Sequence, residues 1–212
     1  MEKTMRKMLY DISPLITPDL KVWPGDTPPS REVLLDMKKG DSLNLSTLHA
    51  TVHLGAHVDA LSHCGIDAPS IECWPPERFV GPCEVVRISV DRACLVGLEA
   101  LTEPVRVERI LLVTNSFPDP TRFNEDFAAL APDLIEHLAE LGVKLVGIDT
   151  PSVDLFASSD LETHRACLRC DMAILEGLVL KHVPPGAYEL IALPLRLVGF
   201  DASPVRAVLR EL

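Results

Sequence analysis

The chain has 212 residues, 47% of them hydrophobic, so it can bury a sizeable apolar core, and a single domain spanning residues 1–212 is the default for this length. Acidic residues outnumber basic ones by 31 to 20, and the resulting net charge of -11 argues against nucleic acid or an anionic membrane as the main partner. We therefore expect a small-molecule partner.

The amino terminus contains basic residues, but no apolar segment follows them. No stretch of the sequence approaches the roughly 18 apolar residues that a membrane-spanning helix needs. We therefore expect a soluble, cytoplasmic protein. The six cysteines show no spacing typical of a disulfide framework, and the single Cys167-Leu-Arg-Cys170 pair is interpreted as packing rather than as a metal or redox motif.

Short strand-like runs outnumber helices along the chain. The predicted strands are, in order, 8–16, 31–37, 45–59, 83–90, 109–114, 144–148, 172–176 and 188–193. A helix is predicted at 131–141, with Pro132 near its start and Gly142 just after its end. A terminal helix is expected after Ser203, and less regular helical patterns occur at 96–101 and 161–168. Strands and helices that alternate in the second half predict a mixed α/β domain.

The run HLGAHVDALSH, residues 53–63, is the most informative segment. Residues 46–59 alternate with the period of a strand, so one face is apolar and the other carries six residues: His49, Thr51, His53, Gly55, His57 and Asp59. Such a strand would align two imidazoles and a carboxylate, with Gly55 leaving room for an ion. These donors suit zinc, manganese or iron(II), so the segment predicts a metal site.

Further ligand candidates lie in the second half of the chain. His164 and Glu176 stand beside or within short elements, and Glu176 lies among apolar residues, where a carboxylate needs a partner. Asp149 and Asp154 could orient a metal-bound histidine or could serve as turn or capping residues. His49 is left open between a place beside the ligands and a place on the surface.

Six segments together resemble one family. They are DISP at 11–14, VWPGDTP at 22–28, HLGAHVDALSH at 53–63, GIDTPSVD at 147–154, HRACLRCDMAILEGL at 164–178 and DASPVRA at 201–207. The match runs nearly end to end, and the chain resembles the bacterial kynurenine formamidases of the metal-dependent cyclase-like hydrolases. The resemblance implies a mixed α/β fold of the swivelling β/β/α type, and a homodimer.

The resemblance also implies a site with two divalent metal ions, zinc or else manganese. His53 and His57 would bind one ion and His164 the other, and two carboxylates, Asp59 and Glu176, would bridge them. His63 would be the general acid/base, although the residues alone leave open that it is a further ligand. Trp23 would pack against the aromatic ring of the substrate; without the resemblance it would be interpreted as an apolar anchor.

The activity implied is hydrolysis of N-formyl-L-kynurenine to L-kynurenine and formate, in tryptophan degradation. Metal-activated water would attack the formyl group, and His63 would give a proton to the departing amine. One departure from the family motif is visible, because Leu61 and Ser62 replace a proline and a bulky residue. Two alternatives stay open: a related hydrolase that opens a cyclic amide such as isatin, or a lactone, and a non-catalytic metal-binding protein.

Overall fold

The computed structural model describes residues 7–212. The basic part of the amino-terminal segment considered above therefore lies partly outside the described residues. The strands are β1 (Leu9–Asp11), β2 (Ser30–Leu35), β3 (Leu45–His49), β4 (His57–Asp59), β5 (Val80–Arg87), β6 (Leu95–Val96), β7 (Arg109–Val113), β8 (Ala129–Leu130), β9 (Leu145–Ile148), β10 (Ala173–Glu176), β11 (Gly186–Ile191), β12 (Ala202–Pro204) and β13 (Val208–Glu211). The α-helices are α1 (Pro132–Glu140) and α2 (Glu162–Arg169), and a short 3₁₀ helix, η2 (Leu61–His63), follows β4.

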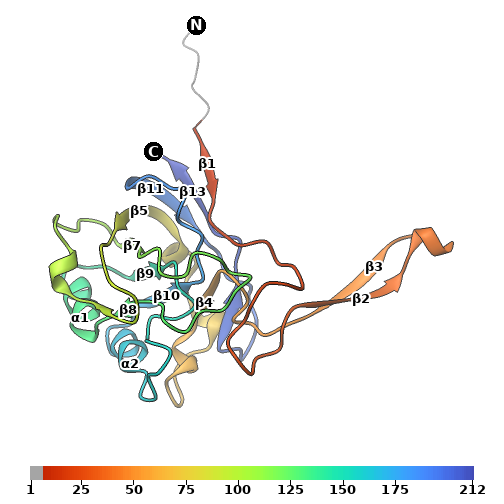
Figure 1. Ribbon diagram of the computed structural model, residues 1–212, viewed down its shortest axis with the longest axis horizontal. Helices are drawn as coiled ribbons and strands as arrows, with labels where there is room; N and C mark the ends of the chain where they lie inside the picture. Colours follow the sequence, from red (N-terminus) through yellow and green to blue (C-terminus); the bar gives the residue numbers. More distant parts are fainter. Residues whose placement is uncertain (1–6) are drawn as a thin grey trace, which may run out of the picture.

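Within residues 7–212, nine strands form one curled sheet in the order β1-β13-β11-β5-β7-β9-β10-β4-β12 (Figure 1). The central strands β5, β7, β9 and β10 run parallel, whereas the pairs toward both ends of the sheet are antiparallel. The curl gives the sheet the shape of a half barrel. The predicted mixed α/β architecture is therefore confirmed.

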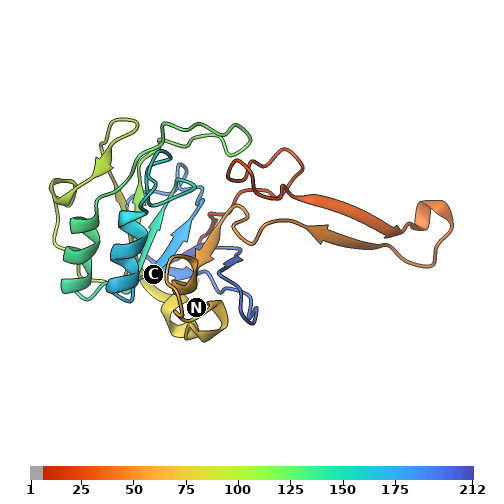
Figure 2. The same ribbon diagram turned by 90° about the horizontal axis from the view of Figure 1, so that it is seen from below.

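Alternate residues of the central strands pack into two cores on opposite faces of the sheet. On β7, Ile110 and Leu112 contact the core beneath the helices, whereas Leu111 and Val113 face the core enclosed by the curled sheet. Helices α1 and α2 lie together on the first of these faces (Figure 2). Every residue of β7 and β9 is buried, as expected for parallel strands covered on both faces.

Two of the predicted helices are present. Helix α1 matches the prediction at 131–141, with Pro132 at its first turn, and α2 matches the pattern at 161–168. The pattern at 96–101 contains only a 3₁₀ turn, Leu98–Ala100. Cys167 is buried in the core beneath the helices and Cys170 packs against it, in line with a packing role.

The predicted terminal helix is wrong, because the chain after residue 201 forms β12 and β13. Strand β13 inserts between β1 and β11, where Leu209 is fully buried and its neighbour Arg210 is exposed. Pro204 belongs to β12, the outermost strand of the sheet, where a missing backbone N–H breaks no ladder. Tertiary pairing has therefore overridden the local proline signal.

The single strand predicted at 45–59 is also wrong. Strand β3 ends at His49 and pairs with β2 in a two-stranded arm that projects from the rest of the fold (Figures 1 and 2). The chain then returns through residues 50–56, in which Gly55 has a positive φ of 58°, and enters the main sheet as β4. The regular alternation at 46–59 therefore spans two strands that belong to different sheets.

None of the helices described in residues 7–212 is long and apolar enough to cross a membrane.

Candidate metal centre

The centre is built where β10 and β4 pair at one end of the sheet. Their antiparallel register places Glu176 opposite His57, and Asp59 follows on the same face of β4. All three side chains are at least 96% buried. The sheet thus holds two carboxylates and an imidazole together in a water-poor environment.

Each of the two carboxylates faces histidines on both of its oxygens. Asp59 places Oδ1 3.1 Å from Nδ1 of His53 and 3.5 Å from Nε2 of His57, and Oδ2 3.4 Å from Nε2 of His164. Glu176 places Oε2 3.3 Å from Nε2 of His57 and Oε1 3.6 Å from Nε2 of His164. The carboxylates therefore lie between two sets of imidazole nitrogens.

Three buried atoms at this point, Nε2 of His57 and both oxygens of Asp59, have no hydrogen-bond partner among the described residues. Unpaired buried polar atoms cost about 1–3 kcal/mol each, so a cluster of them needs an explanation. Nδ1 of His57 donates to the carbonyl oxygen of Gly55 at 2.9 Å, and this leaves Nε2 directed at the carboxylates as an acceptor. Imidazole and carboxylate donors in this arrangement fit divalent metal ions.

His164 is held by the start of α2. Its Nδ1 donates to Oδ2 of Asp154 at 2.6 Å, and Asp154 also accepts the backbone N–H groups of Thr163 and His164 at 3.0 Å each. Asp154 therefore does both things that the sequence left open, because it caps the helix and orients the histidine. Asp149 holds a turn, since it accepts from the backbone N–H groups of Thr114 and Asn115 and from the hydroxyl of Thr114.

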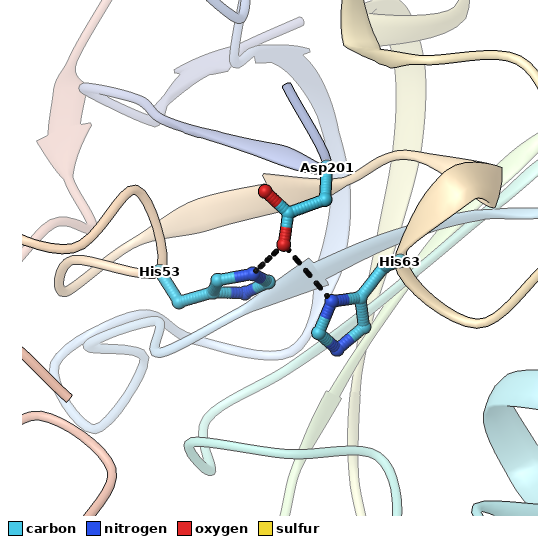
Figure 3. Close-up of side chains that lie close together, drawn as sticks. All are labelled: His53, His63 and Asp201. Atoms are coloured by element: carbon cyan, nitrogen blue, oxygen red, sulfur yellow. Dashed lines mark hydrogen bonds and ion pairs between the residues drawn. The ribbon is translucent and has the colours of Figure 1, made fainter. Parts of the chain in front are cut away.

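His63 lies at the end of η2 and approaches the cluster from its more open side. Its ring centre is 4.4 Å from that of His53 and 5.5 Å from that of His164. Figure 3 shows that one carboxylate oxygen, Oδ2 of Asp201, lies between His53 and His63, at 3.1 Å from Nε2 of His53 and 3.4 Å from Nδ1 of His63. Sequence reasoning did not single out Asp201; the only signal was its place in DASPVRA.

For the histidine segment, the structure settles the place of His49 and corrects the expectation for Gly55. His49 lies on the exposed arm and pairs with Glu32 at 2.9 Å, so it belongs to the surface. Gly55 does not leave room for an ion, because a Cβ at this position would lie 2.9 Å from Cγ of Pro14. Position 55 requires a glycine because its φ is positive and because the loop that leads into β4 packs closely there.

The charges of the cluster shift the pKa values of its members. Burial raises the pKa of Asp59, but contacts with His164 and His53 outweigh it and hold this pKa well below its usual range. Burial lowers the pKa of His53, but Asp59 and Asp201 outweigh it and raise this pKa to about 9. The pKa of His164 is also raised, because Asp154 and Asp59 outweigh burial. The buried carboxylates are thus stabilised by nearby positive charge, which protonated histidines or a metal cation can supply.

A cavity of about 590 Å³ opens beside the cluster, a size that suits a small organic molecule. His53, His57, His63, His164 and Glu176 line one end of it. Trp23 lines another part and is supported by aromatic neighbours, whose ring centres lie 5.1 to 6.2 Å from its own: Phe156, Phe123 and Phe127. The cavity therefore joins the polar cluster to an aromatic wall.

The chain is similar to known proteins over nearly its whole length. The family model described as "Putative cyclase" matches residues 10–155. A kynurenine formamidase of Bordetella avium is 46% identical over 208 residues, which cover 97% of this chain and 99% of that protein. A kynurenine formamidase of Bordetella petrii is 43% identical over the same shares of both chains. A solved structure described as a potential metal-dependent hydrolase with cyclase activity is 26% identical, with a TM-score of 0.86 over 98% of this chain and 99% of that one.

Proposed function

The chain belongs to the "Putative cyclase" family, and we infer that it is a kynurenine formamidase, a metal-dependent hydrolase that converts N-formyl-L-kynurenine to L-kynurenine and formate. The observation that carries this inference is the pair of buried carboxylates, Asp59 and Glu176, each of which faces histidine nitrogens on both oxygens beside a cavity. Tryptophan degradation is the pathway in which this reaction belongs.

We propose that the centre holds two ions. His53 and His57 would hold one and His164 the other, with Asp59 and Glu176 shared between them. Support comes from the division of the carboxylate oxygens, because Oδ1 of Asp59 faces His53 and His57 whereas Oδ2 faces His164. Zinc is the proposed metal and manganese the alternative, since nitrogen and oxygen donors serve both.

Metal ions bound here would supply Lewis acidity toward the formyl oxygen and would lower the pKa of a water molecule to about 7. The protein must then protonate the arylamine nitrogen as the C–N bond breaks, because an amide anion is a poor leaving group. His63 is proposed for this step. Its Nδ1 faces Asp201, so its second ring nitrogen is left to exchange protons in the cavity (Figure 3).

Trp23 is proposed to contact the aromatic ring of the substrate. It lines the same cavity as His63, and the rings of Phe156 and Phe123 pack against it. A fixed aromatic side chain orders a planar ligand at little entropic cost, so the formyl group at the other end of the ligand would be presented to the metal cluster.

We also propose a homodimer in which the arm contacts a second copy. Six large apolar side chains of the arm are 46–60% exposed: Val33, Leu34, Met37, Leu43, Leu45 and Leu48. The arm projects away from the rest of its own fold (Figure 2), and exposed apolar side chains gathered in this way often mark an interaction surface. Light scattering should give twice the chain mass for the native protein and a smaller mass for Leu34→Glu/Leu48→Glu. A monomeric mass for the native protein would contradict the dimer.

A cytoplasmic location is proposed because all six cysteines are free thiols, as in proteins of reducing compartments. We further propose that residues 1–212 form one domain of the swivelling β/β/α type, because both cores share the same sheet.

A related hydrolase acting on a cyclic amide such as isatin, or on a lactone, would need the same metal donors, so the cavity alone would distinguish it. The experiment is therefore hydrolysis of N-formyl-L-kynurenine and of isatin by the zinc-loaded protein and by the chelator-treated protein. We expect rapid, metal-dependent turnover of the formyl compound. Turnover of isatin alone would favour the cyclic amidase, and activity on neither substrate with metal still bound would favour a non-catalytic protein.

A further inference from the structure

We propose that Asp201 is a positioning residue that fixes the ring of His63 for proton transfer and ties it to His53 through a single carboxylate oxygen. The expected effect on kcat rests on the proposed function, whereas the expected effect on the tautomer of His63 does not. Asp201 would not touch the reacting atoms; it would act through the two histidines.

The backbone of Asp201 is fixed to the strand that carries the metal donors. β12 pairs with β4 so that Ala202 lies opposite Asp59, and the backbone N–H of Ala60 donates to the carbonyl oxygen of Asp201 at 2.8 Å. The backbone that carries the Asp201 carboxylate is therefore anchored to β4. Its Oδ2 projects into the gap between His53 and His63 (Figure 3).

This oxygen accepts two hydrogen bonds, and each bond selects the tautomer of one ring. When Nε2 of His53 donates to it, Nδ1 is left as the lone-pair nitrogen, and that atom lies 3.1 Å from Oδ1 of Asp59. When Nδ1 of His63 donates to it, Nε2 is left free to accept or give a proton. Asp201 therefore determines which nitrogen of His53 faces the metal donors and which nitrogen of His63 faces the cavity.

His63 needs such a partner. Its side chain is 29% exposed, and among residues 7–212 Asp201 is the one hydrogen-bond partner of its ring. The ring sits on η2, a turn of three residues that ends at His63. The hydrogen bond to Asp201 is therefore what fixes the orientation of the imidazole.

The test is a double-mutant cycle on zinc-loaded protein with Asp201→Asn, His63→Ala and the combined variant. At saturating zinc, Asp201→Asn should lower kcat on N-formyl-L-kynurenine about 10- to 100-fold, with KM within twofold of the native protein. In the His63→Ala background at saturating zinc, the same substitution should change kcat less than twofold, because the ring whose proton transfer it supports is gone. Asp126→Asn, an exposed carboxylate that pairs with Arg92, is the matched control and should leave kcat unchanged.

Equal losses of kcat in both backgrounds at saturating zinc would overturn the proposal, since Asp201 would then not act through His63. A readout independent of activity is the tautomer of His63, from long-range ¹H–¹⁵N correlation of its ring. We expect Nδ1–H in the native protein and a mixture with Nε2–H in Asp201→Asn. The same tautomer in both proteins would also overturn it. If the native protein shows no formamidase activity, the proposed function fails, whereas the tautomer result still decides the role of Asp201.

Discussion

Nδ1 of His164 donates a hydrogen bond to Oδ2 of Asp154 across 2.6 Å, in a site where both side chains are at least 95% buried. The bond leaves Nε2 of His164 to face Asp59 and Glu176. Because Asp154 also accepts the first backbone N–H groups of α2, the helix and the imidazole are oriented by the same carboxylate.

Asp154→Asn is therefore expected to weaken metal binding about 10- to 100-fold, as loss of an outer hydrogen-bond partner does at other metal sites. Competition with a chelator indicator measures this affinity. Asp149→Asn is the matched control, because Asp149 is also a buried carboxylate that accepts backbone N–H groups, yet it contacts none of the histidines. Asp149→Asn should lower the stability of the protein but keep its metal affinity. If the two variants bind metal equally well, Asp154 does not orient His164 for metal binding.

Metal loading should release protons near neutral pH. The pKa of His53 in the metal-free folded protein is raised from 6.5 to about 9, so between these values the ring is protonated before metal binds. A metal ion takes only the neutral imidazole, so binding must displace that proton. Calorimetry at about pH 7.5 in two buffers of different ionisation enthalpy should detect the release, and it should diminish above about pH 9. No release at the lower pH would contradict the charge state inferred for His53.

Gly177→Ala should weaken metal binding, because the added side chain would displace backbone that positions His57. A Cβ at Gly177 would overlap the carbonyl oxygen of Gly55, and that oxygen holds Nδ1 of His57. Gly177 also has a positive φ of 67°, which costs a residue with a side chain about 1–2 kcal/mol. We expect a lower melting temperature together with a loss of metal affinity.

Gly142→Ala separates these two effects, since Gly142 has a φ of 89° but nothing within 4 Å of an added Cβ. This control should lower the melting temperature by the backbone strain alone and should keep the metal. If Gly177→Ala behaves in the same way, the contact with Gly55 does not position His57.

Trp23→Ala should raise KM for N-formyl-L-kynurenine with little change in kcat, because the lost contact would hold the substrate equally before and during reaction. Loss of one aromatic contact of about 0.5–1.5 kcal/mol corresponds to a rise of about 2- to 10-fold. Trp23→Phe should restore most of the binding. A fall in kcat at unchanged KM would show that Trp23 does not act through substrate binding.

The sequence predicted the residues of the site better than the path of the chain between them. His53, His57 and Asp59 do come together, because their donor types and close spacing are local features that survive errors in the strand assignment. His164 and Glu176 join them from distant parts of the chain, and only the resemblance had linked them to this site. The alternation at 46–59 could not reveal that His49 leaves on the arm, since a period of two continues across the loop at 50–56 without any polar break. The roles of the individual residues stay predictions.

The places of Asp201 and the carboxyl-terminal strands depend on long-range pairing, which local sequence patterns do not reveal. Pro204 and the residues after it have a plausible helical start, and only the neighbours β1, β4 and β11 decide that they form strands. Asp201 is 138 residues from His63 in the chain, so no local spacing could join them. Helix α1, by contrast, was predictable because Pro132, the apolar stripe and Gly142 are all local signals.

The most direct test of the two-metal formamidase account is a titration of the metal-free protein with zinc while hydrolysis of N-formyl-L-kynurenine is followed. We predict no turnover without metal, and a rise that ends at about two equivalents of zinc per chain, as a centre with two carboxylates shared between ions requires. Full turnover by the metal-free protein, or a plateau at one equivalent, would contradict it.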